Sequence, residues 1–292
     1  MVDIMIIGQI TRDHNIDWDG REEFRPGGAV TFSGYAASAL RHSVAVVPKG
    51  NTALIDPYEV FRKSRVEMIF PVNCSSCTEM ENTYFTADRE RRRSLCTQMI
   101  PPYRPEDLPE EKARIYHLAG LVAGDIGPDM IKACAALGDV ALDVQAVLRC
   151  RNKDGSLELR DWPDKKKYLP LIRYLKTDAA EAEVLTGTDD REKAAFLLCE
   201  WGAKEVLITH NSEAIVCDGK EIFRAPLKPR NLSGRTGRGD TTFAGYLGER
   251  LNCGIPQALR FAAALVSLKM ETPGPFMGTR ADVERYLLRV YR

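Results

Sequence analysis

Short apolar runs recur along the chain, and segments whose apolar positions repeat with helical spacing lie between them. Uninterrupted runs of aliphatic residues are typical of strands that are buried on both faces of a parallel sheet. We expect strands at 4–7, 44–47, 115–118, 140–142, 174–176 and 206–209. We expect helices at 32–40, 129–136, 179–185, 191–201 and 240–251. The alternation predicts an α/β fold whose mostly parallel sheet is covered by helices on both faces.

Two segments interrupt this alternation. Residues 12–24 and 67–99 mix polar and apolar positions in an extended pattern, and the second contains a charged turn at 88–93. We interpret them as a small β-sheet lid, separate from the main sheet. No repeat or flexible linker divides the chain, so we expect a single domain over residues 1–292.

The composition narrows the class of protein. The chain of 292 residues has 41 basic and 41 acidic side chains, a balance that gives no electrostatic reason to bind nucleic acid. No apolar run is long enough for a membrane helix, and the N-terminal run lacks the basic flank of a signal peptide. Eight unevenly spaced cysteines indicate reduced thiols, so we expect a cytoplasmic protein.

The most informative stretch is the glycine-rich segment 233–242, which leads into the helix expected from residue 240. The free N–H groups and the dipole of a helix N-terminus favour an anion, and Gly237 and Gly239 would let a phosphate approach the backbone. A P-loop would need lysine where Asp240 stands, and a dinucleotide fingerprint would have its glycines in another order and earlier in the chain. Neither of these motifs fits.

An acidic residue beside an anion-binding loop suits phosphoryl transfer to an alcohol. The alcohol loses its proton when it attacks the phosphoryl group, so Asp240 is expected to be the general base. The backbone of residues 237–240 would stabilise the charge that spreads over the transferred group. The other interpretation of Asp240 is an ordinary helix N-cap.

The motifs, in their order and spacing, resemble the ribokinase-like (PfkB) family of carbohydrate kinases. The run Thr236-Gly237-Arg238-Gly239-Asp240 is similar to the family's T-G-A-G-D signature. The resemblance covers nearly the whole chain and implies a three-layer sandwich with a small lid. It further implies ATP and Mg²⁺ as cofactors and a homodimer formed through the lid.

The resemblance also implies roles for individual residues. Asp13 and the pair Gly27-Gly28 would bind the acceptor, and Thr209 and Asn211 would contact the nucleotide. Asp178 and Glu181, in a segment similar to the family's N-x-x-E motif, would order magnesium. Gly237, Arg238 and Gly239 would join Asp240 in the catalytic loop, with Arg238 binding phosphate oxygens.

The chain departs from the family pattern at several of these positions. Phe32 stands where ribose and fructose kinases carry an asparagine that binds sugar hydroxyls, so ribose is expected to be a poor substrate. The segment around Phe32, and Asp143 followed by Arg149, resemble inositol-kinase-like members instead. Asp178 replaces an asparagine, Gly234 replaces an acidic residue, and Asn211 replaces a glycine.

We therefore predict ATP-dependent phosphorylation of a hydroxyl group on a small sugar or polyol. Two alternatives stay open: a nucleoside kinase of the same family, and a non-catalytic protein that senses a nucleotide or a sugar on the same fold. The pair Cys74 and Cys77 has no second pair at zinc-finger spacing, and the sequence assigns it no role.

Overall fold

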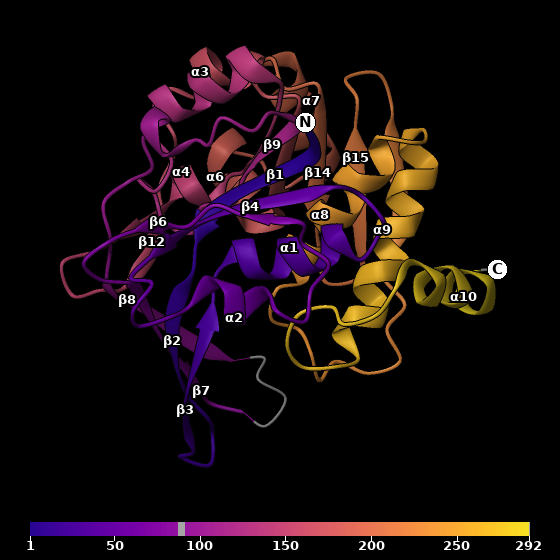
Figure 1. The fold of residues 1–292 in the computed structure, drawn as a ribbon. Coiled ribbons are helices and arrows are strands. Elements are labelled where there is room, and N and C mark those ends of the chain that lie inside the picture. The colour runs from indigo at the N-terminus through magenta and orange to yellow at the C-terminus, as the bar shows by residue number, and fades with distance from the viewer. Residues whose placement is uncertain (87–90, 292) are drawn as a thin grey trace.

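The computed structural model describes residues 1–86 and 91–291, and its main sheet has ten strands within them. The order across the sheet is β16-β15-β14-β13-β10-β9-β1-β4-β5, with β6 also paired to β4 (Figure 1). The strands are β1 (Val2–Gln9), β4 (Val44–Gly50), β5 (Met68–Ile69), β6 (Val72–Asn73), β9 (Ala113–Leu118), β10 (Asp139–Asp143), β13 (Tyr174–Asp178), β14 (Glu205–Thr209), β15 (Glu213–Cys217) and β16 (Ile222–Pro226).

All six apolar runs fall inside strands of this sheet, which confirms the predicted strand positions. From β14 to β5 the neighbouring strands are parallel, while β15 and β16 add an antiparallel edge. The apolar residues of β1 are fully buried because helices cover the sheet on both faces, as the uninterrupted runs predicted.

Helices form the two outer layers of this sandwich. One core packs α1, α8, α9 and α10 against the sheet, and the other packs α3, α6 and α7 against the opposite face. The helices are α1 (Ala29–Ser38), α2 (Pro57–Phe61), α3 (Pro128–Leu137), α4 (Gln145–Leu148), α5 (Lys165–Tyr168), α6 (Ala179–Thr186), α7 (Arg191–Glu200), α8 (Arg238–Arg250), α9 (Ile255–Met270) and α10 (Arg280–Val290). In the described residues, no helix is both long and apolar enough to span a bilayer.

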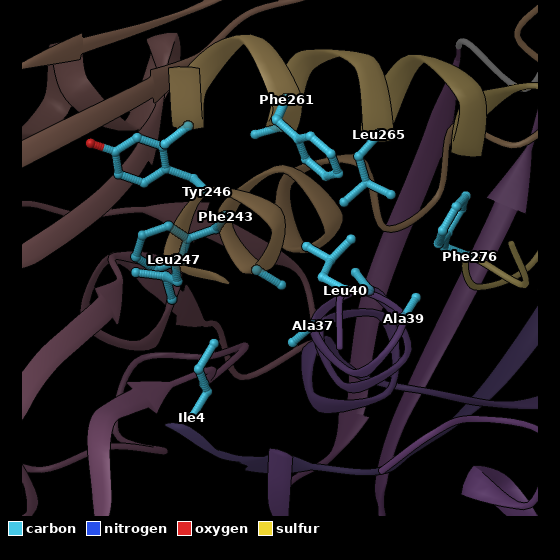
Figure 2. Packing of buried hydrophobic residues seen from close by; sticks show 14 of the residues in the cluster. Ile4, Ala37, Ala39, Leu40, Phe243, Tyr246, Leu247, Phe261, Leu265 and Phe276 are labelled. Carbon is cyan, nitrogen blue, oxygen red and sulfur yellow. The ribbon is translucent and has the colours of Figure 1, made fainter. Parts of the chain in front are cut away.

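The first core holds the glycine-rich loop's helix in place. Side chains of α8, among them Phe243 and Leu247, pack between Leu40, which follows α1, and Phe261 and Leu265 of α9 (Figure 2). Because α8 packs between two helices, its N-terminus and the loop that precedes it are fixed in position relative to the sheet.

A separate four-stranded sheet has the order β3-β2-β7-β8, from β2 (Thr11–Ile16), β3 (Glu22–Gly27), β7 (Thr78–Tyr84) and β8 (Arg92–Gln98). The prediction was wrong for the first part of the segment 67–99. Strands β5 and β6 belong to the main sheet, because their backbone pairs with the edge of β4. Part of the charged turn predicted at 88–93 lies outside the described residues. A short hairpin, β11 (Arg149–Arg151) with β12 (Leu157–Leu159), completes the strands.

Candidate active site

The carboxyl ends of the central parallel strands and the N-terminus of α8 meet at one edge of the main sheet. Gly237 is the N-cap of α8, with a left-handed backbone (φ +77°) that favours glycine. The helix begins at Arg238, two residues before the predicted start, so Asp240 lies in its first turn rather than at its cap. The backbone from 237 to 240 therefore presents the free N–H groups of a helix start.

Asp240 is half-buried and lies near the charged side chains of Asp143, Lys176 and Lys269. Burial and the neighbouring Asp143 raise the pKa of Asp240 to about 6, while Lys176 and Lys269 oppose that rise. A carboxylate with this pKa is ionised at neutral pH and is more basic than an exposed aspartate. These are the properties that a general base requires near pH 7.

Lys176, in the middle of β13, is a site residue that sequence reasoning missed. Its ammonium lies 2.9 Å from Asp143 and 4.0 Å from Glu181, and its side chain is 2% exposed. Burial disfavours its charged form, but Asp143, Glu181 and Asp240 outweigh burial and raise the pKa of Lys176. An aspartate at the carboxyl end of one predicted strand and a lysine within the next were the available signal.

The bare backbone of Gly239 makes room for Lys176. A β-carbon built on Gly239 would lie 3.1 Å from the Lys176 ammonium, closer than an ordinary contact. The second glycine of the loop therefore brings a fixed positive charge against the start of α8. Such a charge beside free N–H groups strengthens the anion site.

Asp13 lies on β2, the first strand of the small sheet, which begins two residues after β1 of the main sheet ends. Its carboxylate accepts a hydrogen bond from the Thr11 hydroxyl at 2.5 Å. A β-carbon on Gly27 would lie 2.1 Å from the Asp13 Oδ2 atom, so this position has no room for a side chain. Gly28 follows as the N-cap of α1. Burial raises the pKa of Asp13 to about 6, although Thr11 and two arginines oppose the rise.

One face of the small sheet continues the polar surface that Asp13 begins. Side chains alternate along a strand, so Asp13 and Asn15 share a face of β2, and Asn82 and Ser94 lie on the same face of β7 and β8. The Asn82 amide donates to Asn15 at 3.3 Å and accepts from the Ser94 hydroxyl at 2.7 Å. Sequence reasoning did not identify this polar row, because the pairing of β2 with β7 joins segments about 70 residues apart.

Arg149 connects this face to the charged strand ends. It begins the β11–β12 hairpin, and burial and the nearby Arg92 lower its pKa, while Glu181 and Asp143 oppose that change. The Arg149 charge also acts on Asp13. The half-buried Arg149 guanidinium therefore interacts electrostatically with Asp13, Asp143 and Glu181.

Thr209 and Asn211, the residues expected to contact a nucleotide, are both hydrogen-bonded within the protein. Thr209 ends β14 and is buried, with its hydroxyl donating to the Thr177 carbonyl at 3.5 Å. Asn211 accepts a hydrogen bond from the Arg238 guanidinium at 2.8 Å. Burial and the nearby Arg235 lower the pKa of Arg238. The Arg235 guanidinium donates to the same Asn211 oxygen at 3.5 Å, so two guanidinium groups lie around Asn211, at the entrance to the loop.

Asp178 and Glu181, the expected magnesium residues, form a capping box at the start of α6. The Asp178 carboxylate accepts from the Glu181 N–H at 2.9 Å, and the Glu181 carboxylate accepts from the Asp178 N–H at 2.7 Å. Among the described residues, no cluster of three or more acidic, histidine or cysteine side chains could hold a metal ion. Two carboxylates beside an anion site nevertheless fit Mg²⁺, which binds through one or two carboxylates together with phosphate oxygens and water.

Cys74 and Cys77 lie beside the carboxyl end of β4, where the Cys74 N–H donates to the Gly50 carbonyl at 2.9 Å. Cys77 is buried, and its sulfur accepts a hydrogen bond from the Asn51 N–H at 3.3 Å. Its contacts are those of a packed thiol in a loop.

Comparisons with known proteins identify several similar kinases. Residues 85–278 match the model of the pfkB family of carbohydrate kinases. A cytidine kinase of Thermococcus kodakarensis is 25% identical over 258 residues, which are 85% of this chain and 88% of that protein. An inositol 3-kinase of Zea mays is 29% identical over 191 residues, 60% of this chain but only 46% of that protein.

Solved structures are similar over nearly the full length. A pyrophosphate-dependent kinase in the ribokinase family, determined with a pyrophosphate analog and myo-inositol, is 32% identical with a TM-score of 0.87, and 97% of this chain and 99% of that chain are covered. A structure reporting conversion of a pyrophosphate-dependent myo-inositol-1 kinase into a myo-inositol-3 kinase is 30% identical with a TM-score of 0.86, over 99% and 100% of the two chains. Arabidopsis thaliana ribokinase, at 17% identity with a TM-score of 0.73 over 98% of each chain, shares the fold.

Proposed function

Since the chain belongs to the pfkB family of carbohydrate kinases, we propose that it phosphorylates one hydroxyl group of a cyclic polyol of the inositol class. The observation that carries the proposal is the polar row of Asp13, Asn15, Asn82 and Ser94. An inositol carries a hydroxyl on every ring carbon, and a row of carboxylate, amide and hydroxyl groups matches such a ligand. The relatives that act on inositols support the same acceptor.

Phe32 supports a polyol over a furanose acceptor. The asparagine that binds sugar hydroxyls in ribose and fructose kinases is replaced here, and the Phe32 ring lies against Gly237. A furanose that relies on that amide would leave a buried hydroxyl unpaired, which costs about 1–3 kcal/mol.

For the donor, the charges around the loop favour pyrophosphate over the ATP predicted from the sequence. Lys176 and Arg238 lie at the start of α8, and Arg238 is bonded to Asn211, where the resemblance placed the nucleotide contact. Cations and free N–H groups can bind all of an inorganic diphosphate, which has no base or ribose to recognise. The pyrophosphate-dependent relatives, 30–32% identical, support this choice.

The transfer needs few groups from the protein. Asp240 accepts the proton of the attacking hydroxyl as the new O–P bond forms and the bridging O–P bond of the donor breaks, which releases inorganic phosphate. The N–H groups of residues 237–240 and the Lys176 ammonium stabilise the charge on the transferred phosphoryl group. When bound, Mg²⁺ would neutralise donor oxygens, and Asp178 and Glu181 are the residues that would hold it and its waters.

A donor–acceptor matrix tests the proposal. Pyrophosphate and ATP are each supplied with myo-inositol, ribose, fructose and cytidine in the presence of Mg²⁺, and product is followed by phosphorus NMR. We expect myo-inositol with pyrophosphate to give the highest kcat/KM. Preference for ATP would overturn the donor assignment alone, and preference for ribose or cytidine would overturn the acceptor assignment. No turnover in any cell of the matrix would favour the non-catalytic alternative.

A further inference from the structure

Lys269, one residue before the end of α9, contacts the backbone of the glycine-rich loop. Its side chain is almost completely buried, and its ammonium donates to the Gly234 carbonyl at 2.5 Å and to the Thr236 carbonyl. Both acceptors belong to the four residues that precede the N-cap of α8. The proposed mechanism gives Lys269 no part, and a lone lysine in an apolar helix was not singled out in the sequence.

Other carbonyl groups converge on the same place. The Gly234 N–H donates to the Met270 carbonyl at 2.7 Å. A β-carbon on Gly234 would lie 1.9 Å from the Thr272 carbonyl oxygen and 3.0 Å from that of Lys269. The loop backbone therefore packs directly on the C-terminal end of α9, where partial negative charge already collects. Backbone carbonyls gathered in this way are the usual ligands of a monovalent cation.

The ammonium of Lys269 supplies the positive charge at this place. Burial lowers the pKa of Lys269 to about 8, and the nearby Asp240 opposes that change, so the amine is protonated at neutral pH. The ammonium also lies 5.3 Å from the centre of the Phe32 ring, which packs on Gly237. Phe32 from α1 and Lys269 from α9 thus support the same loop.

A planar trans peptide links these contacts to the anion site. Its C=O and N–H point in opposite directions, so fixing the Thr236 carbonyl also fixes the direction of the Gly237 N–H. Because Lys269 holds the carbonyl, the N–H faces away from the lysine.

We propose that Lys269 is a positioning residue whose ammonium acts as a built-in monovalent cation, so that the anion-binding loop is held in its active shape without added K⁺ or Na⁺. The inference rests on the proposed function of that loop in phosphoryl transfer. It predicts that turnover depends on the ammonium and not on the monovalent salt in the buffer.

The test compares the full-length wild type with Lys269→Ala and Lys269→Met in chloride salts of K⁺, Na⁺ and tetramethylammonium, at equal ionic strength. We expect equal wild-type turnover in all three salts. In tetramethylammonium, Lys269→Ala should lose about 10²-fold in kcat, the usual effect of one lost donor in an anion hole. K⁺, NH₄⁺ or methylamine should restore much of that loss in Lys269→Ala but not in Lys269→Met, whose side chain fills the space.

Lys228→Met is the matched control, because the Lys228 ammonium also donates to a carbonyl, that of Val290, but on an exposed surface. It should keep wild-type turnover in every salt. Wild-type turnover that rises several-fold with K⁺ would overturn the inference without any variant. Near-normal turnover of Lys269→Ala in tetramethylammonium, or a folded Lys269→Ala that no cation or amine restores, would overturn it as well.

A binding measurement separates this inference from the proposed function. Affinity for imidodiphosphate, a pyrophosphate analog that is not turned over, is measured by calorimetry in K⁺ and in tetramethylammonium. We expect wild-type affinity to be the same in both salts and that of Lys269→Ala to improve with K⁺. If the wild type is inactive with every donor and acceptor, the proposed function fails while this comparison still decides the role of Lys269. Salt-independent affinity of Lys269→Ala would overturn that role.

Discussion

The ring of Phe32 lies directly against the backbone of Gly237, so that a β-carbon built on Gly237 would be 2.1 Å from the Phe32 Cδ1 atom. An aromatic side chain from α1 thus supports the loop at the point where its backbone enters the left-handed region. Gly237 is constrained twice, by its positive φ and by this contact.

We predict that Gly237→Ala lowers kcat by about 10²-fold, because moving the loop away from Phe32 misdirects at least one N–H of the anion hole. The matched control is Gly187→Ala, since Gly187 has nearly the same φ of +75° and no heavy atom within 4 Å of the added carbon. The control should lose about 1 kcal/mol of stability from backbone strain and keep its kcat. Equal kcat in the two variants would show that the contact with Phe32 does not matter.

Many of the strands could be predicted because each is marked by a local run of apolar residues. The apolar runs of β1, β4 and β9 are buried on both faces, so their position could be read without knowing their partners. Helix α9 was not predicted, because its buried residues run without a break from 261 to 267, and such an apolar run does not by itself distinguish a helix from a buried strand. The edge strand β16 is half-exposed and has no such run.

Site residues could be predicted from the sequence only where they are adjacent along the chain. Asp240 and the loop before it are adjacent in sequence, and so are Gly27 and Gly28. Lys176 acquires its role from Asp143, 33 positions earlier, and that pair exists only because β10 and β13 are neighbours. The Asn15–Asn82–Ser94 row likewise depends on strand pairing, which composition and spacing do not reveal.

Asp240→Asn should lower kcat by about 10²–10⁴-fold, the usual contribution of a general base, because the amide keeps the shape but cannot accept the proton. Affinity for imidodiphosphate should be kept, and isothermal calorimetry can measure it alongside the steady-state rates. Near-normal turnover of the variant would exclude Asp240 as the base.

The same variant should be more stable than the wild type in alkaline solution. The folded pKa of Asp240, about 6, lies above its unfolded value near 3.8, so ionisation destabilises the fold as the pH rises between these two values. The gain in melting temperature from Asp240→Asn should therefore be full at pH 8 and disappear near pH 4. A gain that is independent of pH would mean that the buried charge is not its cause.

The pH profile of kcat/KM should have an acidic limb near pH 6. Asp240 must be ionised to accept a proton, and burial raises its pKa to about 6, so activity is lost as the pH falls through that value. Because the pKa of Asp13 is also about 6, Asp13→Asn is the necessary control. The limb should remain in Asp13→Asn, with a weaker KM for the acceptor. Loss of the limb in that variant would assign it to Asp13.

The small sheet should form a two-fold homodimer. Phe24 on the edge strand β3 is 55% exposed, stacked on His14 and covered by the Arg12 guanidinium, on the face opposite Asp13. Exposed aromatic side chains beside an open strand edge favour pairing with a second copy. Sedimentation at micromolar concentration should give twice the chain mass, and Phe24→Asp should give monomers. A wild type that is monomeric with and without substrate would contradict the dimer.

Asn82 and Ser94 should select which hydroxyl of the acceptor is phosphorylated. In a similar myo-inositol-1 kinase, two substitutions, of an asparagine and a serine by leucine, produce a myo-inositol-3 kinase. Here the Ser94 hydroxyl donates to the Asn82 amide on the polar face of the small sheet. Replacing both with leucine removes these partners, so the ring should bind in a different orientation and present another hydroxyl to Asp240.

The double variant Asn82→Leu/Ser94→Leu is therefore expected to change the position of the phosphate in the product, with kcat within about tenfold of the wild type. Phosphorus and proton NMR of the purified product identify the position, and chiral chromatography identifies the enantiomer. Thr83→Leu/Arg93→Leu is the matched control, because this next cross-strand pair points to the opposite face of the same two strands. The control should give the wild-type product. An unchanged product from Asn82→Leu/Ser94→Leu would mean that these side chains do not orient the acceptor, and a changed product from the control would mean that the sheet as a whole has shifted.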